Sequence, residues 1–297
     1  MKSLKKNKKL TGILLLLPLT IWLVAFALYP ILYGLRLSLF NARINNIDNP
    51  TFIGLQNYVK LFSNSEFGQS LWWSLKFALV ATFIQMLLGI LIAWLFQREF
   101  PGKGLATTLI LLPMVVAPFL MGTMFRLLFN ESVGPIAYLL SGLTGTTALL
   151  GLSWMNQTII GADTINRMPF VFINMYSAMQ GVPQELLEAA TMDGPNTFQI
   201  LTQVLIPVLI PVLLPGIGST AILGFITNWN EYLFSGILAF KKSVTAMVGT
   251  SFFITSYAVE WGNMAAAITL STIPTALFIF IAQKSLVKGM TAGAVKG

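Results

Sequence analysis

Long apolar runs dominate this chain. Six windows are long and apolar enough to form helices that cross a membrane: Leu10–Leu32, Leu71–Leu95, Leu105–Leu128, Ile159–Met179, Val204–Phe225 and Met264–Ile281. A crossing α-helix needs about 20 predominantly apolar residues. The fourth window is the weakest, because it contains Asp163, Asn166 and Arg167. Continuous runs, rather than short alternating segments, predict an all-α membrane protein with six transmembrane helices.

The first window has two interpretations. The start "MKSLKKNKK", a leucine run and then Ala25-Phe26-Ala27 are similar to a secretory signal peptide with a cleavage site. However, the apolar run continues through Leu28, Ile31 and Leu32, and further spans follow. We therefore expect a retained first helix rather than a cleaved one.

Composition supports the membrane assignment and excludes several chemistries. The chain has 297 residues, of which 56% are hydrophobic and only 9% are charged, and its mean hydropathy is +0.77. A soluble domain carries about 25% charged residues. Cysteine and histidine are both absent, which excludes thiolate chemistry, Cys/His zinc sites and imidazole catalysis. We expect no catalytic residue and no metal site in this chain.

The net charge of +8 is explained by topology rather than by nucleic-acid binding. With the N-terminus in the cytoplasm, ten basic residues lie inside: Lys2, Lys5, Lys6, Lys8, Lys9, Arg98, Lys103, Lys284, Lys288 and Lys296. Four lie in outer loops: Arg43, Lys60, Lys241 and Lys242. Because cytoplasmic loops carry the basic excess, both termini are predicted to be cytoplasmic, with Trp72 and Trp73 in an outer aromatic belt.

One polar segment interrupts the apolar pattern on the predicted cytoplasmic side. Residues 181–196, "GVPQELLEAATMDGPN", predict a short helix that begins at Pro183 and stops at Gly194-Pro195. About ten residues are too few for a helix that is stable alone, so it must dock on something. The segment carries Glu185, Glu188 and Asp193 and no base. It is either a surface loop packed on its own protein or a plug for a basic groove on a cytoplasmic partner.

The same segment resembles a family motif. Permease subunits of binding-protein-dependent ATP-binding-cassette importers carry Glu-Ala-Ala, three residues, Gly, nine residues and Ile-x-Leu-Pro. This chain has Glu188-Ala189-Ala190, then Gly194, then Val204-Leu205-Ile206-Pro207 at the same spacing. Residues 52–62, "FIGLQNYVKLF", resemble the first outer loop of carbohydrate-type permeases. Residues 228–238, "NWNEYLFSGIL", and residues 261–297 resemble the maltose-type subgroup, so the resemblance covers nearly the whole chain.

The resemblance implies a type I importer fold and a set of partners. A second homologous permease subunit would complete the pathway through the lipid bilayer of a bacterial cell membrane. Two ATP-binding subunits would hold ATP and Mg²⁺, and an extracytoplasmic solute-binding protein would deliver a sugar or oligosaccharide. This chain has no G-x-x-x-x-G-K-[ST] loop, so it needs no cofactor of its own and would not hydrolyse ATP.

The resemblance also assigns residues to the ATPase contacts. The coupling residues would be Glu185, Glu188, Ala189, Ala190, Asp193, Gly194 and Pro207. Glu188 would pair with a basic residue of the ATPase, and Gly194 would permit the turn. In the maltose-type subgroup the tail enters the interface between the ATPases, which implicates Gly293, Lys296 and Gly297. The expected organisation is a basic segment 1–9, a permease domain 10–281 with its coupling loop at 180–203, and a cytoplasmic tail 282–297, of which residues 289–297 are expected to be small and flexible.

Three further features have open interpretations. Asn228, Trp229, Asn230, Glu231 and Tyr232 combine amide, carboxylate and aromatic groups that suit a sugar pathway or an interfacial belt, and we favour the pathway slightly. Asp163 and Arg167 stand four apart and form either a functional site or, more readily, a neutralised structural pair. Pro207, Pro211 and Pro215 recur every four residues and mark either a hinge or a bent packed helix.

Three other function classes compete with the sugar importer. An intramembrane enzyme would have to use Asp163 or Glu231, but no nucleophile–base motif accompanies either residue. An ATP-independent carrier or channel is disfavoured because the sequence shows no inverted repeat. A permease for a non-sugar solute, such as a glycerol phosphodiester, remains open.

Overall fold

The computed structural model describes the backbone of all residues except 1, 152–153, 182–205, 240–242, 256–258 and 295–297. The described part is mostly helical. Its helices are α1 (Lys2–Leu23), α2 (Tyr29–Leu37), α3 (Gln56–Ser63), α4 (Ser65–Leu95), α5 (Lys103–Val115), α6 (Pro118–Leu128), α7 (Pro135–Thr144), α8 (Met155–Gln180), α11 (Ile206–Trp229), α12 (Leu233–Leu238), α13 (Ala246–Gly249) and α14 (Trp261–Ala294). A π-helical segment, η1 (Val24–Leu28), joins α1 to α2, and a 3₁₀ turn, η3 (Thr250–Phe253), follows α13.

Three helical segments in the described residues are long and apolar enough to cross a membrane. They are Leu10–Leu37, Ser65–Leu95 and Trp261–Gln283, and they contain the first, second and sixth predicted spans. The helices α8 and α11 lie where the fourth and fifth spans are predicted. The membrane character of the chain is thus supported, while the number of six crossings stays a prediction.

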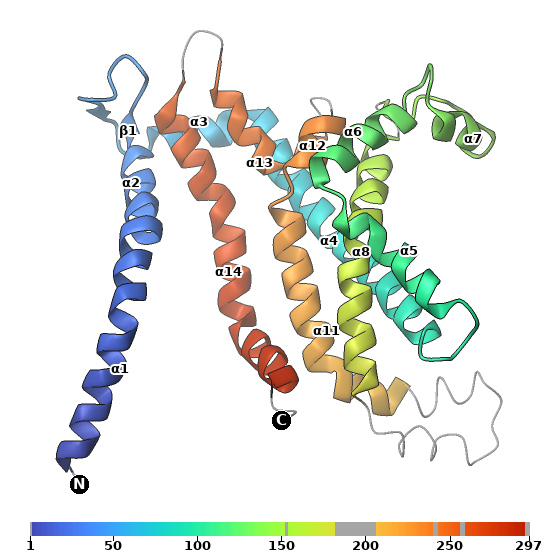
Figure 1. Ribbon diagram of the computed structural model, residues 1–297. Coiled ribbons are helices and arrows are strands. Elements are labelled where there is room, and N and C mark those ends of the chain that lie inside the picture. The colour runs from blue at the N-terminus through green and yellow to red at the C-terminus, as the bar shows by residue number, and fades with distance from the viewer. Residues whose placement is uncertain (1, 152–153, 182–205, 240–242, 256–258, 295–297) are drawn as a thin grey trace. The chain divides into compact units, whose positions relative to one another are not determined.

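The prediction of one continuous third span is wrong. Residues 103–128 form two helices, α5 and α6, which meet at an angle of 98° (Figure 1). The break has a local cause at Pro118. A residue before proline is disfavoured in helical conformation, and Ala117 accordingly has ψ of 130°. The pair is either one broken span or a re-entrant loop.

Proline also shapes the first helical segment. Pro30 lacks an N–H group, and its ring clashes with the carbonyl four residues earlier in a regular α-helix. The chain widens into the π-helical turn η1 just before Pro30 and then continues as α2. The segment therefore remains helical to Leu37, beyond the predicted end at Leu32.

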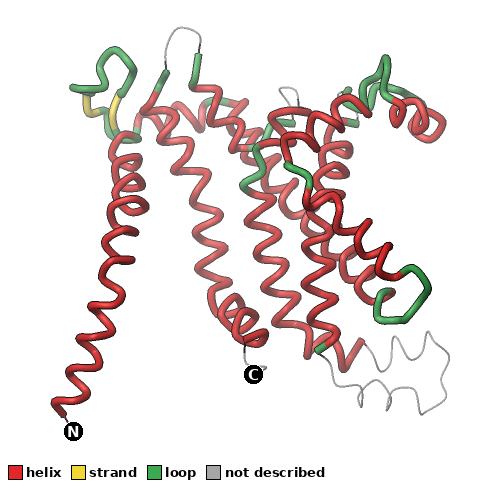
Figure 2. Tube along the Cα trace, viewed as in Figure 1, coloured by secondary structure: helices red, strands yellow, loops and turns green. Residues whose placement is uncertain are grey.

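The chain divides into two compact units, each described here by itself. The first consists of Met1–Gly68 and Thr250–Thr272. It contains the antiparallel pair β1 (Phe40–Asn41) and β2 (Thr51–Phe52), the only strands in the described residues (Figure 2). The buried Asn57 of α3 donates to the carbonyl oxygens of Ser38 and Phe40. This amide fixes α3 against the β1 end of the loop, a detail that the hydrophobic pattern does not predict.

The second unit, Gln69–Gly249 and Ile273–Gly297, holds the larger core. One cluster joins Phe77 of α4, Phe125 of α6, Ile159 of α8 and Phe234 of α12. Another joins α4, α8 and α11 through residues such as Phe96 and Phe172, whose ring centroids are 5.3 Å apart. The first cluster packs α4 and α8 against α6 and α12, and the second holds α4, α8 and α11 together.

Close backbone contact between α4 and α8 depends on a glycine. A Cβ atom at Gly89 would lie 2.6 Å from Val171 Cγ1 and 3.0 Å from the backbone nitrogen of Phe172. Any larger side chain would therefore push the two helices apart. Since Gln85 lies one turn away on the same helix, Gly89 also brings Gln85 within reach of α8.

The last helix is longer than predicted. The sixth span was expected over Met264–Ile281 and a flexible end over 289–297, but α14 extends to Ala294. The residues after Ile281 include Gln283, Lys284, Leu286 and Lys288, which are good helix formers. Gly293 lies within this helix, whereas Lys296 and Gly297 lie outside the described residues.

Candidate functional site

A small cavity with mostly apolar walls and a few polar side chains lies among α4, α5, α8 and α11. Its volume is about 200 Å³. The described residues that line it are Gln85, Met114, Asn166, Arg167, Phe170, Val171, Gly224, Thr227 and Asn228. Polar groups inside an apolar helical protein are costly and mark candidate pathways. The convergence of three amides, a guanidinium and an aromatic ring on one cavity makes it the leading candidate site.

A chain of hydrogen bonds forms one wall of this cavity. Asn228 of α11 donates to Thr82 Oγ1 at 2.9 Å and to Gln85 Oε1 at 3.0 Å, both on α4. Gln85 in turn donates from Nε2 to Asp163 Oδ2 of α8 at 2.8 Å. The network thus links three helices through buried side chains. Such a network is stabilising only when its members are satisfied, so the three helices must keep their relative positions here.

Arg167 completes the network on the cavity side. It lies one turn after Asp163 on α8, and its Nε donates to Asp163 Oδ1. The Asp163 side chain is fully buried, whereas the Arg167 side chain is 22% exposed and lines the cavity. The predicted pairing of Asp163 with Arg167 is therefore present. It also lies at the candidate site, so the structural and functional interpretations of the pair are compatible.

The end of α5 is attached to the same helix. Asn166 Nδ2 donates to the backbone oxygen of Pro113 at 2.8 Å. Because α5 ends at Val115, the carbonyl of Pro113 is one of the last in the helix and lacks a regular intrahelical partner. An unsatisfied carbonyl is especially costly inside a membrane. Asn166 therefore stabilises the break between α5 and α6 beside the cavity.

The five residues predicted for the solute pathway separate in the structure. Of these five residues, Asn228 is the one found among the described residues that line this cavity. Trp229 is 1% exposed and packs with Ala78 and Phe225 in a core cluster, while Asn230 and Tyr232 are exposed. The helix α11 ends at Trp229, so the five residues do not share one helix face, and their assignment to the solute pathway stays a prediction.

Glu231 has a structural environment of its own. Its carboxylate accepts hydrogen bonds from the backbone N–H groups of Phe234 at 2.7 Å and Ser235 at 2.9 Å. These are orphan donors of the first turn of α12, so Glu231 caps that helix. Burial raises the pKa of this carboxyl to about 7, although the hydrogen bond from Ser235 opposes the shift. The contacts place Glu231 in the support of α12 rather than in the cavity.

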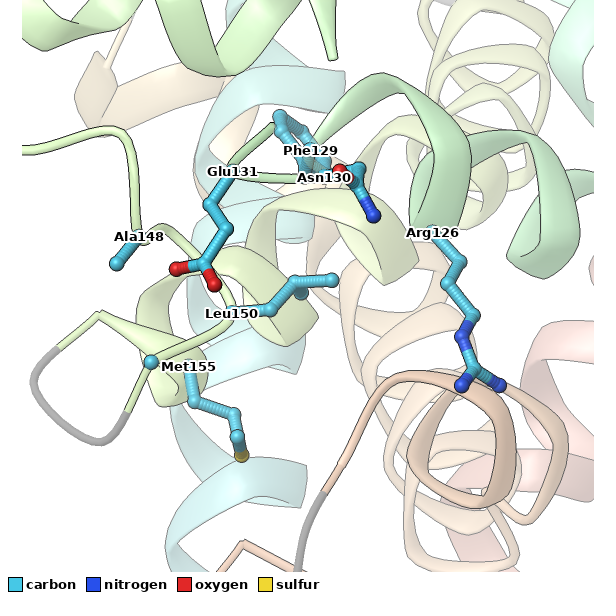
Figure 3. A pocket seen from close by; sticks show the side chains of 8 residues that line it. Arg126, Phe129, Asn130, Glu131, Ala148, Leu150 and Met155 are labelled. Carbon is cyan, nitrogen blue, oxygen red and sulfur yellow. The ribbon is translucent and has the colours of Figure 1, made fainter. Parts of the chain in front are cut away.

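A second, larger cavity of about 390 Å³ lies between the end of α6 and the loop before α8. Figure 3 shows Arg126 and Glu131 on opposite sides of Leu150, with Met155 at the lower end. Both charged residues are exposed. The described residues that line this cavity include both apolar and exposed charged side chains, and their arrangement identifies no bound group.

The coupling residues are not placed by the structure. Glu185, Glu188, Ala189, Ala190, Asp193 and Gly194 lie outside the described residues. Pro207 lies in the first turn of α11. The assignments made for these residues stay predictions.

Sequence reasoning missed several residues of the cavity. Gln85 is an isolated amide in a strongly apolar window, which is itself a signal for a functional or pairing role. Gly224 lies three residues before Thr227 and four before Asn228, so it shares a helix face with both. Gln85 and Asn228 are 143 positions apart, so their contact could not be read from local spacing.

Comparisons with known proteins identify the family. Residues 85–292 match the model of the family described as "Binding-protein-dependent transport system inner membrane component". The trehalose transport system permease protein SugB of Mycobacterium tuberculosis is 30% identical over 280 residues, covering 92% of this chain and 94% of that protein. The trehalose/maltose transport system permease protein MalF of Thermococcus litoralis is 28% identical over 206 residues, covering 66% and 67%.

Solved structures support the fold. A chain of a bacterial alginate ABC transporter, in complex with a periplasmic protein bound to alginate pentasaccharide, has a TM-score of 0.76 at 17% identity. The match covers 95% of this chain and 94% of that chain. The predicted resemblance to carbohydrate-type permeases is confirmed by these relatives. The chain belongs to the family of inner membrane components of binding-protein-dependent transport systems.

Proposed function

We propose that this chain is the permease subunit of an ATP-driven importer of a sugar or oligosaccharide, and that the cavity among α4, α5, α8 and α11 lies on the solute pathway. The observation that carries the proposal is the cavity itself, in a chain of this family. Gln85, Asn166 and Asn228 bring amides into an apolar helical unit, where polar groups are retained for function or pairing.

The chemistry of the cavity suits a sugar. Hydroxyl groups both donate and accept hydrogen bonds, and the described lining offers them the guanidinium donors of Arg167 and the exposed hydroxyl of Thr227. The ring of Phe170 offers an apolar surface for the C–H face of a sugar ring. The names of the two relatives, trehalose and trehalose/maltose permeases, support the same solute class.

Partner proteins supply the remaining parts of the proposed transporter. A second homologous permease completes the pathway, two ATP-binding subunits bind ATP and Mg²⁺, and an extracytoplasmic binding protein delivers the solute. Glu188 and its neighbours dock on the ATP-binding subunits from the cytoplasmic side, and both termini of this chain are cytoplasmic. The alginate transporter, whose structure includes a periplasmic protein, supports a binding-protein partner.

Transport by the reconstituted transporter tests this function. We expect proteoliposomes that contain the complete complex to accumulate labelled trehalose or maltose only when ATP, Mg²⁺ and the binding protein are all supplied. The control replaces ATP with a non-hydrolysable analogue. Equal uptake with and without ATP would instead favour an autonomous carrier or channel.

A further inference from the structure

The two residues of the ion pair at the cavity have unequal access to it. Asp163 is fully buried behind the cavity wall, whereas Arg167 lines the cavity and is 22% exposed. Only the Nε of Arg167 donates to Asp163. Within the described part of the chain, no hydrogen bond from its terminal nitrogens to another side chain is found. The guanidinium of Arg167 therefore offers N–H donors to the cavity, while the buried carboxylate of Asp163 neutralises its charge.

Arg167 is the one charged group among the described residues that line the cavity. An uncompensated guanidinium in a poorly solvated site attracts carboxylate or phosphate groups strongly and often binds them through two hydrogen bonds. A carboxylate at hydrogen-bond distance weakens this attraction, because an incoming anion is repelled by it at short range. The pair thus offers hydrogen bonds without a net charge.

Gln85 holds Asp163 in this role. Its Nε2 donates to Asp163 Oδ2, so the two carboxylate oxygens have different partners, Gln85 from α4 and Arg167 from α8. With both oxygens held, the carboxylate cannot swing away to release the guanidinium. The balance of charge at the cavity is therefore fixed by the helix packing rather than by a mobile surface pair.

From this geometry we propose that Asp163 is a specificity-determining residue, which makes the cavity select uncharged, hydroxyl-bearing solute groups and discriminate against anionic ones. Asp163 acts through Arg167 and does not itself contact the solute. The proposal rests on the proposed function insofar as the cavity lies on the solute pathway. It adds the charge class of the solute and the residue that sets it.

Two glycosides with the same ring provide matched probes. Methyl α-D-glucoside is neutral, and methyl α-D-glucuronoside carries a carboxylate in place of the hydroxymethyl group. The chain has no cysteine, so Thr227→Cys introduces a single thiol at the cavity. Protection of this thiol from a small alkylating reagent, measured on the full chain in its complete complex in lipid nanodiscs, reports occupancy by either glycoside.

We expect the neutral glycoside to protect the thiol at lower concentration than the glucuronoside. In the Asp163→Asn variant the preference should shift toward the glucuronoside by about tenfold or more, as for a charged hydrogen bond gained. The double variant Asp163→Asn/Arg167→Gln removes the cation as well and should lose the shift. A merely structural role of Asp163 would weaken protection by both glycosides equally and would leave their ratio unchanged.

The outcomes separate this proposal from the proposed function. An unchanged ratio in Asp163→Asn, a shift that persists in the double variant, or no protection by either glycoside in the Thr227→Cys background would each overturn the proposal. If Asp163→Asn does not fold, the double variant remains informative, because it must still prefer the neutral glycoside. ATP-driven uptake that persists after any of these failures would leave the importer function intact.

Discussion

Replacing Glu188 by lysine should abolish ATP-driven uptake while the permease still inserts in the membrane. In the proposed function this side chain faces a basic residue of the ATP-binding subunit. Charge reversal there would place like charges in contact and would lose the attractive pair, which costs about 3–5 kcal/mol where the pair is buried. Since each 1.4 kcal/mol is a factor of ten, the docked complex should be depleted by roughly a hundredfold or more.

The measurement is solute uptake together with the amount of ATP-binding subunit that copurifies with the chain. Glu185→Lys provides a graded control, because Glu185 lies nearer the start of the predicted helix and outside the Glu-Ala-Ala motif. We expect it to have the smaller effect. Normal uptake by a well-expressed Glu188→Lys complex would refute the coupling role of this residue.

The second large effect concerns Gln85. Gln85→Leu removes the donor to Asp163 and the acceptor for Asn228 at once. Leaving buried polar groups unpaired costs about 1–3 kcal/mol for each group. We expect the midpoint of thermal unfolding in detergent to fall by roughly 5–10 °C. Uptake should fall with it, because the same bonds hold α4, α8 and α11 around the cavity.

Gln97→Leu is the matched control for this variant. Gln97 is exposed, and its side chain donates only to the carbonyl of Ala93 in the preceding turn. Its replacement should change the midpoint little. If Gln85→Leu were as stable as Gln97→Leu, the hydrogen-bond chain would contribute nothing to the packing of the three helices.

The apolar pattern was sufficient to locate α4, α8, α11, α14 and the first helical segment, because burial in lipid imposes length and hydrophobicity on each of them. It did not predict the shorter helices α3, α7, α12 and α13. The ends and interruptions were harder to predict. The helix break before Pro118 follows a rule that the sequence does contain, but an apolar window on its own does not distinguish a kinked helix from two helices. The extension of α14 to Ala294 uses residues with good helix propensity. The prediction did not count this propensity, because small residues near the end of the chain suggested a flexible tail.

The candidate site was only partly predictable, because sequence spacing reveals contacts between near neighbours on one helix but not contacts between residues far apart in the chain. The pairing of Asp163 with Arg167 follows from four-residue spacing on one helix. The contacts of Gln85 with Asp163 and Asn228 join residues 78 and 143 positions apart, which only the tertiary structure brings together. Conversely, Asn228 and Glu231 are close in sequence but have different roles. Because α11 ends at Trp229, Glu231 lies beyond this helix and caps α12 rather than lining the cavity.

The central claim is that the cavity lies on the solute pathway of the proposed importer. An importer must expose its pathway to one side of the membrane and then to the other, so thiol accessibility at position 227 tests the claim most directly. Thr227 is exposed at the cavity, so Thr227→Cys places the chain's single thiol there. The control Phe83→Cys lies on α4, where Phe83 is exposed by 67% and does not line the cavity. We predict that a membrane-impermeant reagent modifies the thiol at position 227 from one side of the membrane without nucleotide and from the other side in the ATP-trapped complex. The modification rate from each side should change about tenfold or more between the two states. The thiol at position 83 should be modified from the same side and at the same rate in both states. Identical sidedness and rate at residue 227 in both states would contradict the account.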